Sequence, residues 1–312
     1  MPLHSGTGQT SSESNGVKMG IALSFLILTL ICTSHYALMK TFSQKLSYVF
    51  LLAVPFLVTA MAFIFGHLGY WIYLPGWFLN ILLMFLAVRT LGRVKNETVR
   101  RVAWPLIMSW APISIFAGMG PPPETAEGWA ALAWEQQLRY CILIVSGTGT
   151  TIGFLRLYDM LRSGPGLRFA KIGRTMFVIA LPLFIANMVY WGFFLTNVFV
   201  KYSQPGAPAR PDWLQTVSTA FTAVRLIEVT LIYCGTAVFA YALSRSGHLS
   251  RLASRIYIFF CCLGAILNLL PASLPAPLAI ANYVSYIPAI TLLVPYLIGV
   301  NLLAKIKKHT NN

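Results

Sequence analysis

Long apolar stretches, separated by short polar segments, run through the chain from residue 19 to residue 304. A membrane-spanning helix needs about 20 mostly apolar residues. Nine stretches have about this length or more, at residues 19–39, 46–66, 69–91, 102–119, 138–158, 175–200, 214–244, 252–271 and 277–304. The pattern predicts an all-α protein, a polytopic membrane helix bundle of about nine transmembrane helices.

The stretch 102–119 is the shortest of the nine and contains Pro105 and Pro112. Because proline interrupts the hydrogen bonding of a helix, this segment is either a full span or a re-entrant loop. We expect residues 19–304 to form a single transmembrane domain.

Polar segments flank this domain on both sides. Residues 1–18 are rich in Ser, Gly and Thr, and we expect them to form a disordered tail. They contain no apolar core of the kind that a cleaved signal peptide carries. Residues 305–312 form a basic tail, which we expect in the cytosol.

Composition supports a membrane protein and excludes other classes. Hydrophobic residues make up 57% of the chain and charged residues only 10%, whereas soluble domains average about 25% charged residues. A soluble globular enzyme is therefore excluded. The net charge of +15 does not indicate nucleic-acid binding, because the basic residues lie in short loops between apolar runs.

The distribution of basic residues predicts the orientation. If the N-terminus is outside or lumenal, 18 of the 23 Lys and Arg residues fall on the inner side, four on the outer side, and Arg225 within the membrane. Cytosolic loops of membrane proteins carry such an excess. We therefore expect a lumenal N-terminus and a cytosolic C-terminus, in an endoplasmic-reticulum-type membrane if the source is eukaryotic.

Arg225 and Glu228 are the main candidates for chemistry. They lie three residues apart near the centre of the span 214–244, so they share one helix face. A charge at the bilayer centre costs at least about 2.5 kcal/mol, so such residues need a reason to be there. One interpretation is a site wall in which Glu228 is an acid or proton carrier and Arg225 sets its pKa or holds an anionic group. The other is a buried ion pair that locks helices together.

Aromatic and amide side chains form a second group of candidates. Tyr190 and Trp191 lie in the sixth span, and Asn282, Tyr283 and Tyr286 lie in the ninth. Ring faces stabilise cations by about 0.5–2 kcal/mol each, so these residues are candidate substrate-binding groups. Plain core packing is the alternative.

The outer loop after residue 117 offers two further interpretations. It is either a rigid solvated segment or a lid that carries Glu124, Glu127 and Glu135. Its tryptophans, Trp129 and Trp134, indicate a part that lies on the membrane surface.

Two local patterns predict packing and pairing. Gly149 and Gly153 lie four residues apart, a spacing that allows close contact between helices. Arg156 and Asp159 lie three apart, which predicts a local salt bridge, with an inner gate as the alternative.

No metal or cofactor is expected. The five cysteines lie in apolar runs without a zinc-type spacing. His35 is the only histidine inside a span and lacks partners for ligation, and no two aspartates lie near each other.

In its size, its many spans, its scarcity of acids and its buried Glu228 and Arg225 amid Tyr and Trp, the chain resembles the small integral-membrane terpene cyclases of fungal meroterpenoid pathways. The resemblance covers the general plan and no alignable motif. In such families a carboxylic acid protonates an olefin or a terminal epoxide, and aromatic faces steer the resulting cation. The resemblance implies an isomerase or lyase of secondary-metabolite biosynthesis, with Glu228 as the acid and a hydrophobic isoprenoid as substrate. The chain departs from that family in having a single mid-membrane acid.

Other function classes stay open at this point. Broken helices often line transporter sites, so Pro55, Pro182, Pro288 and Pro295 suit a proton-coupled transporter or exporter that uses the Arg–Glu pair. A non-catalytic membrane scaffold is the third class. In each case the expected surroundings are membrane lipid, and nucleic acid is not an expected partner.

Overall fold

The computed structural model describes residues 43–93, 97–203, 206–271 and 274–305. The predicted span 19–39, the tail 1–18 and nearly all of the basic tail 305–312 lie outside the described residues. Every regular element in the described ranges is helical, and no strand occurs among them.

The helices follow one another with short connections. They are α2 (Gln44–Phe65), α3 (Tyr70–Leu91), α4 (Glu97–Met108), the 3₁₀ turn η1 (Pro112–Ile115), α5 (Phe116–Met119), α6 (Ala126–Ala131), α7 (Ala133–Leu161), α8 (Leu167–Val189), the π-helical η2 (Tyr190–Leu195), α9 (Thr196–Tyr202), α10 (Trp213–Arg245), α11 (Arg251–Asn268), α12 (Ala276–Ser285), α13 (Pro288–Thr291) and α14 (Leu293–Lys305).

Seven of the described helical segments are long and apolar enough to cross a membrane. The number is eight if the pair 276–285 and 288–304, which is bent by 66°, counts as one span. These segments match the eight predicted stretches from 46–66 to 277–304. The all-α architecture of a multi-pass membrane protein is thus confirmed, while the total of nine and the orientation stay predictions.

The two prolines in the segment Glu97–Met119 have different effects. Pro105 lies inside α4, whereas Pro112 begins η1, where a missing N–H is tolerated. The whole segment is long enough to be one span. It packs against α7 and α14, and the Trp110 indole nitrogen donates a hydrogen bond to the Ala289 carbonyl oxygen at 3.3 Å.

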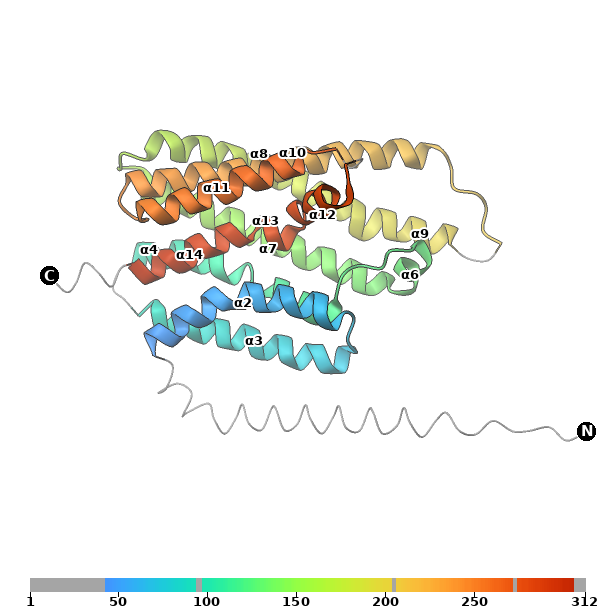
Figure 1. Cartoon of the computed structure of the whole chain (residues 1–312), viewed down its shortest axis with the longest axis horizontal. Helices are drawn as coiled ribbons and strands as arrows, with labels where there is room; N and C mark the ends of the chain where they lie inside the picture. Colours follow the sequence, from blue (N-terminus) through green and yellow to red (C-terminus); the bar gives the residue numbers. More distant parts are fainter. Residues whose placement is uncertain (1–42, 94–96, 204–205, 272–273, 306–312) are drawn as a thin grey trace, which may run out of the picture.

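The long helices lie side by side along one axis (Figure 1). α8, α10 and α11 form one side of the bundle and α2 and α3 the other, with α4, α7 and α14 between them. Three stacked rings fill the contact between α7, α8 and α10: Phe154 lies 4.1 Å from Phe177 and 4.8 Å from Phe239 between ring centroids. This aromatic packing holds α10 against α7 and α8.

One end of the bundle is strongly basic. α4, α8 and α11 begin at this end, and α7, α10 and α14 finish there (left in Figure 1). Most basic residues of these helices and of the turns that join them gather here, whereas Arg139 and Arg225 lie elsewhere on α7 and α10. The residues at this end are Arg100, Arg101, Arg156, Arg162, Arg168, Lys171, Arg174, Arg245, Arg251 and Arg255. The predicted orientation depends on this gathering of basic residues at one end, which would be the cytosolic end.

The predicted small-residue contact is confirmed. A methyl group built on Gly153 would lie 2.6 Å from Leu106 Cδ2, and one on Gly149 would lie 2.8 Å from Ser109 Cβ. Glycine at these positions lets α7 approach α4 closely.

The predicted pairing of Arg156 with Asp159 is wrong. Asp159 pairs with Arg162 at 3.0 Å instead, and Arg156 donates a hydrogen bond to the Arg101 carbonyl oxygen at 3.2 Å. Both carboxylate and guanidinium lie at the helix end, where the local turn brings Arg162 within reach.

Candidate functional site

The centre of α10 carries the candidate acid. Glu228 lies near the middle of this 33-residue helix and is only 2% exposed. Arg225 lies about one turn before it and Phe221 about two turns before it, so the three side chains share one face. The same side includes Thr236, which is buried, but Thr222 is exposed, so only the inner part of this polar face looks into the bundle.

Glu228 is held by an amide from the neighbouring helix. Asn187 in the last turn of α8 donates a hydrogen bond from Nδ2 to Glu228 Oε1 at 3.2 Å. The other carboxyl oxygen, Oε2, is buried without a hydrogen-bond partner among the described residues, and so is Asn187 Oδ1. The carboxyl group therefore has one fixed oxygen and one unengaged oxygen.

Arg225 does not pair with Glu228. The ion pairs among the described residues are those of Glu135, Glu97 and Asp159. The Arg225 guanidinium instead lies over the Tyr286 ring, with Cζ 3.6 Å from the ring centroid. The ring comes from the break between α12 and α13, so the interhelical contact of Arg225 is a cation–π contact rather than an ion pair.

The aromatic candidates separate into two groups. Tyr190 is buried and stacks on Phe221 at 4.0 Å with the ring planes nearly parallel, while Tyr283 packs edge-on against Tyr286 at 5.4 Å. The structure therefore places these rings along the face of α10 that carries Arg225. Trp191 packs edge-on against Tyr190 at 5.7 Å and also lies 6.3 Å from Trp129 between ring centroids, so it joins this group to α6.

Asn282 has a different neighbourhood from the one expected. Its amide nitrogen donates to the carbonyl oxygens of Leu267 at 2.8 Å and Leu270 at 3.1 Å. These carbonyls lie at the end of α11, where helical carbonyls lack partners of their own. In this arrangement Asn282 caps α11.

Two amides beside the site were missed by the sequence reasoning. One is Asn187, and the other is Asn268, which donates to the Leu226 carbonyl oxygen at 3.0 Å and to Thr230 Oγ1 at 3.1 Å. A lone amide inside an apolar span was the available signal, because a buried amide needs hydrogen-bond partners.

The helix that carries Asn187 changes its geometry next to the site. Immediately after α8 the chain forms the π-helical turn η2, which contains Tyr190. Such turns are rare and frequently occur at functional sites. The turn places Tyr190 against Phe221 while Asn187, three residues earlier, faces Glu228.

Little space is left between α7, α8 and α10. A cavity of about 10 Å³ lies there, lined among others by Phe177, Phe184 and Ile232. This is about the volume that one water molecule requires. Glu228 does not line this cavity, and because its side chain is only 2% exposed, a ligand reaches it only if the groups packed around it move.

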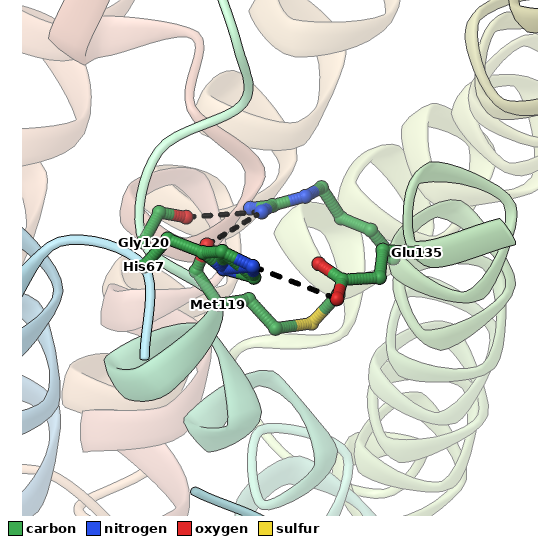
Figure 2. Close-up of polar contacts among 5 residues, drawn as sticks. His67, Met119, Gly120 and Glu135 are labelled. Atoms are coloured by element: carbon green, nitrogen blue, oxygen red, sulfur yellow. Dashed lines mark hydrogen bonds and ion pairs between the residues drawn. The ribbon is translucent and has the colours of Figure 1, made fainter. Parts of the chain in front are cut away.

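A second buried polar cluster lies in the region of the predicted outer loop, at the end of the bundle opposite to the basic end (Figure 2). Glu135 is only 5% exposed, and its Oε1 lies 3.7 Å from His67 Nε2. Arg139, one turn later on α7 and 7% exposed, donates to the carbonyl oxygens of Met119 at 3.4 Å and Gly120 at 3.0 Å. This cluster ties the start of α7 to the end of α5 and to the loop after α2.

The outer loop thus differs in part from both expectations. Glu124 and Glu127 are exposed, whereas Glu135 is neither solvated nor part of a loop, because α7 begins at Ala133. Trp134 is exposed, but Trp129 is buried and donates a hydrogen bond from Nε1 to Thr196 Oγ1 at 2.8 Å. Trp129 is thus enclosed by protein, because α6 packs against α9, and the place of this segment on the membrane surface stays a prediction.

Comparison of the chain with family models, with curated proteins and with solved structures finds no match. Among the described residues, no group of three or more His, Cys, Asp or Glu side chains gathers where a metal ion would be held.

Proposed function

We propose that the protein is an integral membrane enzyme that cyclises an isoprenoid or other lipid-like substrate, with Glu228 as the acid that starts the reaction. The observation that carries the proposal is the environment of the Glu228 carboxyl group. Asn187 donates a hydrogen bond to one carboxyl oxygen, the other oxygen has no partner among the described residues, and the Arg225 guanidinium lies over the Tyr286 ring. A carboxyl group without an ion-pair partner in apolar surroundings favours its neutral, proton-donating form.

The proposed reaction balances without an added reagent. Glu228 Oε2 gives its proton to an olefin carbon or an epoxide oxygen of the substrate, and a carbocation forms. Ring closure moves the positive charge along the chain, where the rings of Tyr190 and Tyr283 stabilise it. The Glu228 carboxylate then takes a proton from another carbon, so the product is an isomer and the acid is regenerated.

Asn187 and Arg225 have supporting roles in this scheme. The Asn187 amide holds Oε1, so that Oε2 keeps one direction. Arg225 lies one turn from the carboxylate that forms after proton transfer and stabilises it by its charge. We place the enzyme in secondary-metabolite biosynthesis, of the meroterpenoid kind, in an endoplasmic-reticulum-type membrane.

A proton-coupled transporter is the second candidate, and one observation favours it. The π-helical turn η2 and the 66° break between α12 and α13 flank the Arg225–Tyr286 contact. Interrupted helices that line a site at mid-membrane are typical of secondary transporters. In this scheme Glu228 carries the coupled proton.

The test is to express the chain, prepare microsomes and incubate them with prenylated phenols and their terminal epoxides. The native chain should release cyclised isomers of unchanged mass. Glu228→Gln keeps the shape and the contact with Asn187 but removes the acidic proton, so product formation should fall by about 10²-fold or more. Glu127→Gln, at an exposed carboxylate of α6, is the matched control and should retain activity.

Three outcomes contradict the enzyme proposal. One is no cyclised product from the native chain at normal abundance. Another is full activity in Glu228→Gln. The third is pH-driven uptake of a substrate into proteoliposomes that Glu228→Gln abolishes, which would replace the enzyme by the transporter.

A further inference from the structure

A surface recess opens between α7 and α8 at the basic end of the bundle. Its volume is about 390 Å³, and it is lined by Tyr158, Lys171, Arg174, Thr175 and Val178. It lies far from Glu228 along α8, because Asn187 is at the other end of that helix. The recess is therefore separate from the candidate catalytic site.

The lining of the recess is cationic and lacks a compensating acid. Asp159 is the nearest described carboxylate in sequence, and it is already paired with Arg162 at 3.0 Å. Neither Lys171 nor Arg174 forms an ion pair with any residue in the described ranges. Two positive charges thus face the same space.

Tyr158 holds one of these charges in place. The ring is buried, and the guanidinium carbon of Arg174 lies 4.9 Å from its centroid. The guanidinium carbon of Arg162 lies 5.2 Å from the same centroid. Because a cation–π contact limits the motion of a long side chain, Arg174 is oriented before any ligand arrives.

The recess continues into the apolar surface of α8. Lys171, Thr175 and Val178 follow at helical spacing, so they form one strip of the helix. Val178 is 51% exposed and lies about 10 Å deeper along the axis than Lys171. Ile172 and Ile179 are also exposed beside this strip.

We propose that this recess binds the phosphate group of an anionic phospholipid from the leaflet at the basic end. Lys171 and Arg174 contact the phosphate, and the Thr175–Val178 strip contacts the first part of an acyl chain. Basic pockets between membrane helices bind lipid head groups in this manner. A soluble phosphate compound has the same charged group but gains nothing from the apolar strip, so the geometry favours the lipid.

The experiment measures lipid binding to the full chain, purified in neutral detergent, by native mass spectrometry. Phosphatidic acid is the probe, and phosphatidylcholine is the neutral comparison. The double variant Lys171→Gln with Arg174→Gln should lose about 30-fold in affinity for phosphatidic acid, since each basic group near an anionic lipid contributes about a factor of five. Phosphatidylcholine binding should not change.

Matched controls separate the recess from the general charge of this end. Arg251→Gln with Arg255→Gln removes two exposed charges at the same end, on α11, and should leave phosphatidic acid binding within about twofold. Lys171→Arg with Arg174→Lys keeps both charges and should retain most of the affinity. Thermal unfolding without lipid verifies that each variant is folded.

Two results overturn the inference. If the α11 variant loses as much affinity as the recess variant, the lipid responds to net charge alone. If inorganic pyrophosphate at equal concentration displaces phosphatidic acid, the recess is a site for a soluble anion. Glu228→Gln should bind phosphatidic acid as the native chain does, so failure of the proposed enzyme activity leaves this test unaffected.

Discussion

The contact between Asn187 and Glu228 makes a quantitative prediction about the stability of the bundle. Asn187→Leu replaces an amide by a side chain of similar volume and removes the hydrogen bond that Asn187 donates to the Glu228 carboxyl group. Because Glu228 is 2% exposed, water does not replace the lost donor. A buried polar group left without a partner costs about 1–3 kcal/mol, so the free energy of unfolding should fall by that amount.

The same substitution made in a Glu228→Leu chain shows whether the lost stability comes from the contact between the two residues. In a chain that already carries Glu228→Leu, the carboxyl group is absent, and Asn187→Leu removes an amide that has itself lost its partner. The same substitution should then be nearly neutral or stabilising, because replacing both partners by apolar groups leaves nothing unsatisfied. The difference between the two backgrounds is the coupling energy.

The assay is reversible denaturant unfolding of the purified protein in mixed micelles, for the native chain, the two single variants and the double variant. We expect a coupling of about 0.5–2 kcal/mol; interhelical hydrogen bonds in membranes average about 0.6 kcal/mol. A coupling of zero, with Asn187→Leu equally costly in both backgrounds, would refute the hydrogen bond as the reason for the cost. The double variant should also be inactive, because it lacks the acid.

Two further predictions concern packing and orientation. Gly153→Ala should lower the free energy of unfolding by about 1–3 kcal/mol, since the new methyl group overlaps Leu106 Cδ2. The control is Gly76→Ala, which has nothing within 4 Å of its new methyl group and should not destabilise the protein in the same denaturation assay. A reporter fused after the C-terminus should be cytosolic by protease protection in sealed microsomes, because the basic residues gather at the end where α14 finishes; a lumenal reporter contradicts the orientation.

The spans were predictable from the sequence because they depend on local properties. Chain length, apolar content and the absence of charge are enough to identify a segment that must form its backbone hydrogen bonds internally in lipid. For the same reason the sequence identified Glu228, since a single acid in the middle of an apolar span is visible without any knowledge of its neighbours. The burial of this residue in the structure agrees with that expectation.

The partners of these residues were not predictable, because contacts between helices depend on how each helix is rotated about its axis. Asn187 is 41 residues from Glu228 in sequence and meets it only through the packing of α8 against α10. Arg225 was expected to interact with Glu228 on its own helix, but the break before α13 offers the face of Tyr286.

The tertiary structure also decided which polar residues are buried. Glu135 looked like a loop carboxylate, yet it is enclosed because α7 starts early and packs against the loop that holds His67. Asn282 is a candidate substrate-binding residue by sequence, and the structure adds that its amide nitrogen donates to carbonyls at the end of α11. A sequence shows which side chains are polar and how far along a helix they lie. Whether water, lipid or another helix faces them is settled only when the helices pack, because burial is a property of the neighbours.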